Sequence, residues 1–193
     1  MWALVESGSV SQVYTRPKQL TLGDVQYPSN IFNMWTSSEL EAIGIYEVVI
    51  DNTNYKDPEY YINTNQSFAF GSGKVTATYG TATAKDLADS GSGDTLVRGL
   101  KYIHSQTIDN QAYSLLQPND WMVVKATETS GTVASDWTTY RAGVRTAAND
   151  MKTKINAVSD VDALAALYVY NDADPPVRPL GEFPDAPTSW LKF

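Results

Sequence analysis

Cysteine is absent from the 193-residue chain, and histidine occurs once, at His104. Without cysteine the chain has no disulfide, no thiolate nucleophile and no cysteine ligand for zinc. A serine-hydrolase triad would need His104 as its base, and no Gly-x-Ser-x-Gly turn accompanies it. We therefore interpret His104 as an ordinary surface or partly buried helix residue. We predict a protein that is not an enzyme and has no catalytic residue, metal site or cofactor.

Long apolar runs and an excess of basic side chains are missing as well. The chain has 14 lysines and arginines against 22 aspartates and glutamates, so its formal net charge is −8. Binding of nucleic acid needs a basic face for the phosphates, so we expect no nucleic-acid partner. No apolar run approaches the roughly 20 residues of a membrane span, and the N-terminus lacks the pattern of a signal peptide. We expect no membrane insertion and a cytoplasmic origin.

The first 84 residues predict a β-rich module. Short apolar or alternating segments separated by turn residues indicate strands at residues 2–6, 10–14, 45–51, 60–63, 66–70 and 74–79. In the last segment apolar and polar side chains alternate strictly, which is typical of a sheet with one buried face. Because the turns are short, we predict a small antiparallel β meander. Ser38 and Glu41 fit a capping box and predict a short helix over residues 38–43.

The remainder of the chain changes character twice. Residues 85–95 contain the Gly/Ser/Asp-rich run Asp89–Asp94 and predict a linker. An apolar period near 3.6 then predicts a helical module over residues 96–170, with helices at 96–117, from Asp120 and from Ser135. Residues 171–193 hold five of the nine prolines and predict an extended tail. The predicted fold class is α+β, with the β meander followed by a helical hairpin or bundle and the Pro-rich tail.

Aromatic side chains supply candidate binding residues. Trp121 and Trp137 are interpreted as core anchors between helices. Tyr60, Tyr61 and Phe68 are candidates for a ligand face, and sheet packing is the alternative because tyrosine favours strands. Trp190 and Phe193 follow the Pro-rich segment, and we interpret them as a docking tip for another chain or for the body of this one.

Arg141 and Arg145 lie one helical turn apart in the helix predicted from Ser135. This spacing places both on one face, where they could pair with an acidic partner or with Asp120 and Glu128. A solvated basic face is the alternative. Asp120 is also expected to cap the helix that Trp121 anchors.

One pattern resembles a known family. It begins with Leu115–Thr129, which contains Asp120-Trp121 and the apolar run after it, and continues through Trp137, Tyr140-Arg141 and Val144-Arg145. This pattern resembles the C-terminal segment of bacteriophage tail-fibre assembly chaperones and related small tail proteins. In that family a Phe-Pro pair and a nearby Trp often follow, as Phe183-Pro184 and Trp190 do here. The start Met1–Glu6, with Pro28 and Ile31-Phe32, also resembles such proteins.

The resemblance implies a phage tail-associated protein without enzymatic activity. It would assist tail-fibre assembly in the host cytoplasm or remain in the virion tail as an adaptor, bound to a fibre or baseplate protein. The partner-binding residues would be Trp121, Tyr140, Arg141, Arg145, Phe183, Trp190 and Phe193. A virion-displayed receptor- or carbohydrate-binding module that uses the aromatic β face is the alternative function, and self-association into a homo-oligomer is left open.

Overall fold

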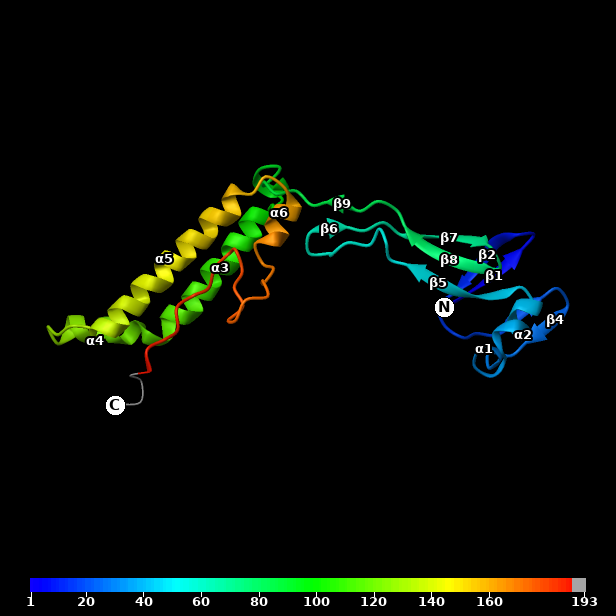
Figure 1. The fold of residues 1–193 in the computed structure, drawn as a ribbon, viewed down its shortest axis with the longest axis horizontal. Coiled ribbons are helices and arrows are strands. Elements are labelled where there is room, and N and C mark those ends of the chain that lie inside the picture. The colour runs from blue at the N-terminus through cyan, green and yellow to red at the C-terminus, as the bar shows by residue number, and fades with distance from the viewer. Residues whose placement is uncertain (189–193) are drawn as a thin grey trace. The chain divides into compact units, whose positions relative to one another are not determined.

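The computed structural model describes residues 1–188 and divides the chain into two compact units, Met1–Thr83 and Ala84–Phe193. Unit 1 is built mainly of strands and unit 2 mainly of helices (Figure 1), so the predicted α+β class is confirmed. None of the helices within residues 1–188 combines the length and apolar character needed to cross a membrane.

Unit 1 contains a five-stranded sheet with the order β2-β1-β5-β8-β7. Its strands are β1 (Trp2–Glu6), β2 (Ser9–Tyr14), β5 (Ile45–Asp51), β7 (Gln66–Gly71) and β8 (Lys74–Tyr79). Two small ladders accompany it, β3 (Leu20–Leu22) with β4 (Val25–Tyr27) and β6 (Tyr61–Ile62) with β9 (Thr83–Ala84). The turn from β1 to β2 uses Ser7 and Gly8 at φ 50° and 76°, as a tight hairpin requires.

The sheet departs from a pure antiparallel meander at one pair. Strands β5 and β8 run parallel, with Val48 opposite Val75 and Ile50 opposite Ala77. The hairpin β7–β8 enters the sheet with β8 inside and β7 at the edge. The side chains explain this choice, because Val75 and Ala77 are fully buried and suit a central strand.

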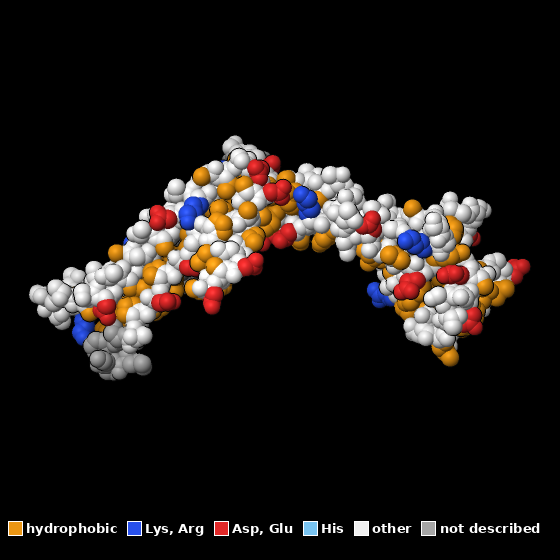
Figure 2. Space-filling view, viewed as in Figure 1, with side chains coloured by type: hydrophobic (Ala, Val, Ile, Leu, Met, Phe, Trp, Pro, Cys, Tyr) orange, Lys and Arg blue, Asp and Glu red, His pale blue; other side chains and the backbone are white. Residues whose placement is uncertain are grey.

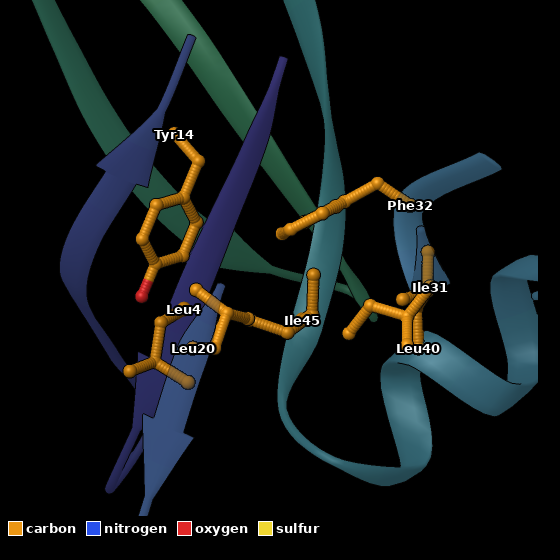
Figure 3. Packing of buried hydrophobic residues seen from close by; sticks show 7 residues of the cluster. All are labelled: Leu4, Tyr14, Leu20, Ile31, Phe32, Leu40 and Ile45. Carbon is orange, nitrogen blue, oxygen red and sulfur yellow. The ribbon is translucent and has the colours of Figure 1, made fainter. Parts of the chain in front are cut away.

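Two hydrophobic clusters cover opposite faces of the sheet. One consists of Ala3, Val48, Val75 and Ala77, partly covered by side chains such as Tyr46, Phe68 and Phe70. On the other face lie the short helices α1 (Ile31–Met34) and α2 (Ser37–Ala42). Figure 3 shows the second cluster, in which side chains from both helices and the strands meet: Leu4, Tyr14, Leu20, Ile31, Phe32, Leu40 and Ile45.

The predicted capping box at Ser38 and Glu41 is wrong by two residues. Thr36 is the N-cap of α2, and its hydroxyl accepts from the Glu39 N–H at 3.3 Å. The Glu39 carboxylate accepts in return from the Thr36 N–H at 2.7 Å and from the Thr36 hydroxyl at 2.8 Å, and these two hydrogen bonds lower the pKa of Glu39. This register makes Leu40 the residue that enters the core.

Unit 2 is a hairpin of the long helices α3 (Leu100–Leu116) and α5 (Ser135–Ala157), which lie side by side (Figure 1). Between them come the turn η2 (Gln117–Asn119) and α4 (Asp120–Glu128), and α6 (Val161–Ala166) follows α5. The core is formed by apolar side chains of α3, α5, α6 and the tail: Leu100, Ile108, Ala112, Trp137, Val144, Ala148, Met151, Ile155, Leu164 and Leu180. His104 is buried in α3, and its Nδ1 lies 2.8 Å from the Tyr168 hydroxyl.

The segment predicted as a linker is hydrogen-bonded to the start of α3. The N–H groups of Leu100 and Lys101 donate to the carbonyls of Asp86 and Leu87 at 2.9 and 3.1 Å. The Gly99 N–H donates to the Asp89 carboxylate at 2.8 Å. These bonds satisfy the free N–H groups of the helix terminus, and α3 therefore begins at Leu100 and not at residue 96. The turn η1 (Gly93–Thr95) lies within this segment.

The Pro-rich tail has no helix or strand after α6 in the described part, as its prolines predict. It returns along the helical hairpin (Figure 1), where Leu180 is 1% exposed. Lys154 Nζ donates to the carbonyls of Pro179 and Leu180 at 2.8 and 3.1 Å. The first half of the tail is therefore part of the folded unit.

Candidate functional site

Helix α4 presents apolar side chains to solvent. None of its residues is buried, and Trp121, Val123 and Val124 are 47%, 42% and 56% exposed. The helix lies where the α3–α5 hairpin is joined (Figure 1), and the loop after it and the start of α5 lie beside it. The prediction of a core anchor is confirmed for Trp137, which is 2% exposed, and is wrong for Trp121.

A groove of about 220 Å³ separates α4 from the start of α5. Trp121 and Met122 of α4 line it, together with Val133 of the loop and Trp137 of α5. Lys125 lies 5.8 Å from the centre of the Trp121 ring and gives the groove a cationic rim. The groove thus combines exposed aromatic surface with a single charge.

The buried side chain of Arg141 connects the start of α4 to the helical hairpin. Arg141 is 7% exposed, and its guanidinium donates to Asp120 Oδ1 at 2.7 Å, to the Leu116 carbonyl at 3.2 Å and to Asn119 Oδ1. Asn119 is itself 1% exposed and donates to the Leu115 carbonyl at 2.9 Å. The pairing of Arg141 with Asp120 that the sequence offered is therefore formed.

Two related predictions are wrong. Asp120 does not cap α4, because its carboxylate accepts from Arg141 and no side-chain cap precedes the helix. The basic residues of α5 do not form a free basic face either, since Arg141 is buried and Lys152 pairs with Asp109 at 2.6 Å. Arg145 is exposed, and its guanidinium donates to the Arg141 carbonyl at 3.3 Å. Arg141 is thus placed as a positioning residue for α4.

Tyr140 and Phe183 lie beside a second groove, of about 650 Å³, between α3 and the tail. Tyr140 is 6% exposed and contacts Trp137 edge to face at a ring distance of 5.6 Å; burial raises the pKa of its phenol. Pro184 lies against α5 at Gly143, where an added Cβ would come within 3.3 Å of its ring. Trp190 and Phe193, also predicted to bind a partner, lie outside the described residues.

Of the three candidates for a ligand face in unit 1, Tyr60 is buried, and Tyr61 and Phe68 are partly buried. Tyr60 is 7% exposed and has no free ring surface for a sugar. Phe68 covers the Val75 and Ala77 cluster, which is the sheet-packing alternative. Tyr61 lies under the ammonium group of Lys56, 4.3 Å from the ring centre.

The surface of unit 2 carries no concentrated charge on the side seen in Figure 2, where acidic side chains are scattered among exposed hydrophobic ones. Within residues 1–188, no three carboxylate or imidazole side chains come together in a way that could hold a metal ion. Sequence reasoning missed Val123 and Val124 as surface residues. Their signal was an apolar run in a helix too short to be covered on all sides.

The chain matches no model of a known protein family, no curated protein and no solved structure.

Proposed function

We propose that the protein is a non-enzymatic bacteriophage tail-associated protein that binds a tail-fibre or baseplate protein. It acts either in tail-fibre assembly or as an adaptor in the tail. The phage assignment rests on the pattern from Asp120-Trp121 to Tyr140-Arg141, which resembles small phage tail proteins. The observation that carries the binding role is the exposed apolar surface of α4, with the groove beside it.

Exposed aromatic and aliphatic side chains on a fixed element favour protein binding. Tryptophan is enriched among the residues that dominate the binding energy of protein interfaces. The buried Arg141 contacts hold the start of α4 in place before a partner arrives, so less conformational freedom is lost on binding. The tail lies along the same hairpin, where residues 182–186 line a second groove beside α3.

The experiment is co-expression of the chain with candidate tail-fibre and baseplate proteins. The double variant Trp121→Ser, Val124→Ser removes the exposed apolar surface of α4. We expect at least a tenfold loss of recovered complex, because central aromatic contacts contribute about 2 kcal/mol or more each. Ile103→Ser on α3, where the side chain is 48% exposed, is the matched control and should bind normally. Equal recovery of all three proteins would contradict the proposal.

The tail needs its own variant. Removal of residues 176–193 would also remove Leu180, which is buried in the core, so a shorter deletion of residues 189–193 tests docking without that loss.

Analysis of purified virions distinguishes a role in assembly from a role as an adaptor in the tail. An assembly factor is absent from them, whereas an adaptor is present in a fixed copy number.

A further inference from the structure

A pocket of about 150 Å³ opens in unit 1 on the sheet face that carries α1 and α2. Trp2 and Glu47 lie directly opposite each other across the β1–β5 pair, so both side chains reach this face. Phe32 from α1 and Trp35, which follows α1, add aromatic walls. Phe32, Leu40 and Ile45 line the pocket and also belong to the core cluster in Figure 3.

The rings of this pocket are held in place by other rings. Trp2 contacts Phe32 at a ring distance of 4.8 Å with a tilt of 51°. Trp35 contacts Tyr27 edge to face at 5.8 Å. Trp2 and Trp35 are only half-buried and keep ring surface open to solvent, whereas Phe32 is buried. Trp2 and Phe32 are therefore tilted walls and not parallel plates.

The pocket is suited to a cation. Glu47 is its one charged lining residue, and in the part of the chain that the structure describes no side chain pairs with this carboxylate. Aromatic faces carry negative potential that attracts cations, and the net charge of −8 adds to this attraction. Lys18 is the cation beside the core cluster that contains Tyr14. Its ammonium group lies 4.9 Å from the centre of the Tyr14 ring and makes no ion pair with Glu47.

The volume of the pocket and the hydrogen-bonding groups in its lining limit which cations can bind. The volume is several times the ~30 Å³ of one water but below the roughly 300 Å³ of sites for drug-sized ligands, so one compact group fits. A primary ammonium is a compact and strongly hydrated charge, so placing it against aromatic rings costs part of its water shell. A guanidinium presents five N–H donors in one plane, and the side-chain acceptors in the lining are Ser37 and Glu47. A trimethylammonium group has no donors and is nearly spherical.

We propose that this pocket binds a small trimethylammonium cation of the choline type. The methyl groups contact Trp2, Trp35 and Phe32, and Glu47 is the counter-ion. Ser37 and Glu47 are both exposed and can accept a hydrogen bond from the hydroxyl of choline. A phosphate on the ligand would face Glu47 and be repelled, so the free alcohol is preferred over phosphocholine. The site lies within unit 1 and does not depend on the function proposed for α4.

The test titrates the full chain with choline chloride and with 3,3-dimethylbutan-1-ol, the neutral isostere of choline. Binding is followed by the NMR signals of the tryptophan indole N–H groups, which Trp2→Phe and Trp35→Phe assign. We expect saturable shifts at Trp2 and Trp35 and choline binding about 5- to 30-fold tighter than that of the alcohol. Equal affinities, or shifts at neither tryptophan, would overturn the proposal.

Variants separate the charge from the rings. Glu47→Gln should weaken choline binding severalfold and leave binding of the neutral alcohol unchanged. Trp35→Leu should remove the preference for choline over the alcohol. Glu41→Gln, an exposed glutamate of α2 outside the pocket, is the control and should behave as the parent. If Trp35→Leu does not fold, Glu47→Gln decides alone, and unchanged choline affinity in that variant overturns the proposal.

Two further ligands test the assignment to a small cation. Phosphocholine should bind more weakly than choline, and a peptide with trimethyllysine should bind no more tightly than choline. Tighter binding of either ligand contradicts the assignment.

Discussion

Arg141 shows how a single side chain can position an element that adds nothing to the core. Its guanidinium reaches three acceptors, the side chains of Asn119 and Asp120 and the carbonyl of Leu116, at the junction of α3 and α4. Removal of a guanidinium from such a place leaves buried acceptors without donors, which costs more than the hydrogen bonds themselves contribute. Arg145, one turn later, is exposed and makes one long contact.

We therefore predict that Arg141→Ala lowers the free energy of unfolding of unit 2 by about 2–4 kcal/mol. Arg145→Ala should change it by less than about 0.5 kcal/mol. Urea unfolding followed by helical circular dichroism measures both values. Similar losses in the two variants would mean that the Arg141 contacts do not hold the structure together.

A second residue-scale prediction concerns pH. Asp160 caps α6, and the hydrogen bond from the Ala163 N–H, followed by that from the Ser159 hydroxyl, lowers the pKa of its carboxyl below the usual 3.8. Because the pKa is lower in the folded state, the ionised cap stabilises the fold at pH values above the unfolded-state pKa. This stabilisation is lost as the pH falls through the folded-state pKa.

Asn also caps helices but does not titrate, so Asp160→Asn isolates the effect. The parent should melt at a higher temperature than this variant above pH 5, and the difference should shrink below about pH 4. Melting temperatures across this range provide the measurement. A difference that stays constant down to pH 2.5 would contradict the assignment of the cap.

At the scale of elements, local patterns located the strands and tertiary contacts determined their partners. Alternating side chains placed strands at residues 2–6, 45–51 and 74–79, and the structure has the same bounds. The parallel pairing of β5 with β8 was not predictable, because it depends on which hairpin strand best fills a central position. The capping box was misplaced because Thr36 and Ser38 are both suitable caps, and only the burial of Leu40 distinguishes them.

In the candidate site, too, the sequence identified the aromatic residues, and tertiary packing determined which of them are exposed. Trp121 and Trp137 have equivalent sequence signals, and each opens a helix after a polar residue. Trp137 lies on a helix long enough to face α3, whereas α4 is short and has solvent on several sides. Which tryptophan became exposed therefore depended on packing that no local pattern contains. The aromatic pocket of unit 1 was missed because Trp2 and Trp35 are far apart in the sequence.

An element-scale prediction follows from the start of α3. A Cβ on Gly99 would lie 2.4 Å from the backbone of Ala88 and 2.5 Å from the Leu87 carbonyl, and backbone cannot move aside as a side chain can. Gly99→Ala should cost about 1–3 kcal/mol and fray the first turn of α3. Gly131→Ala, whose nearest neighbour is the Thr129 hydroxyl at 3.2 Å, should cost less. Amide exchange at Ile103 and denaturant unfolding measure the two effects, and equal costs would contradict this account.

At the scale of the whole molecule, each unit contains its own hydrophobic core. Unit 1 has a cluster on each face of its sheet, and both clusters consist of residues before Thr83. A chain of this length can bury enough apolar surface to fold without help. We predict that residues 1–83 expressed alone give a dispersed amide NMR spectrum that includes the indole signals of Trp2 and Trp35. A collapsed spectrum would mean that unit 1 needs the rest of the chain.

We propose that α4 and its groove bind a phage tail protein. Hydrogen–deuterium exchange of the full chain, with and without the fibre or baseplate protein that it retains on co-expression, tests this binding. We expect the partner to slow exchange in residues 120–134, which comprise α4 and the loop beside its groove, and to leave exchange in the sheet of unit 1 unchanged. Protection confined to unit 1, with unchanged exchange over residues 120–134, would contradict it.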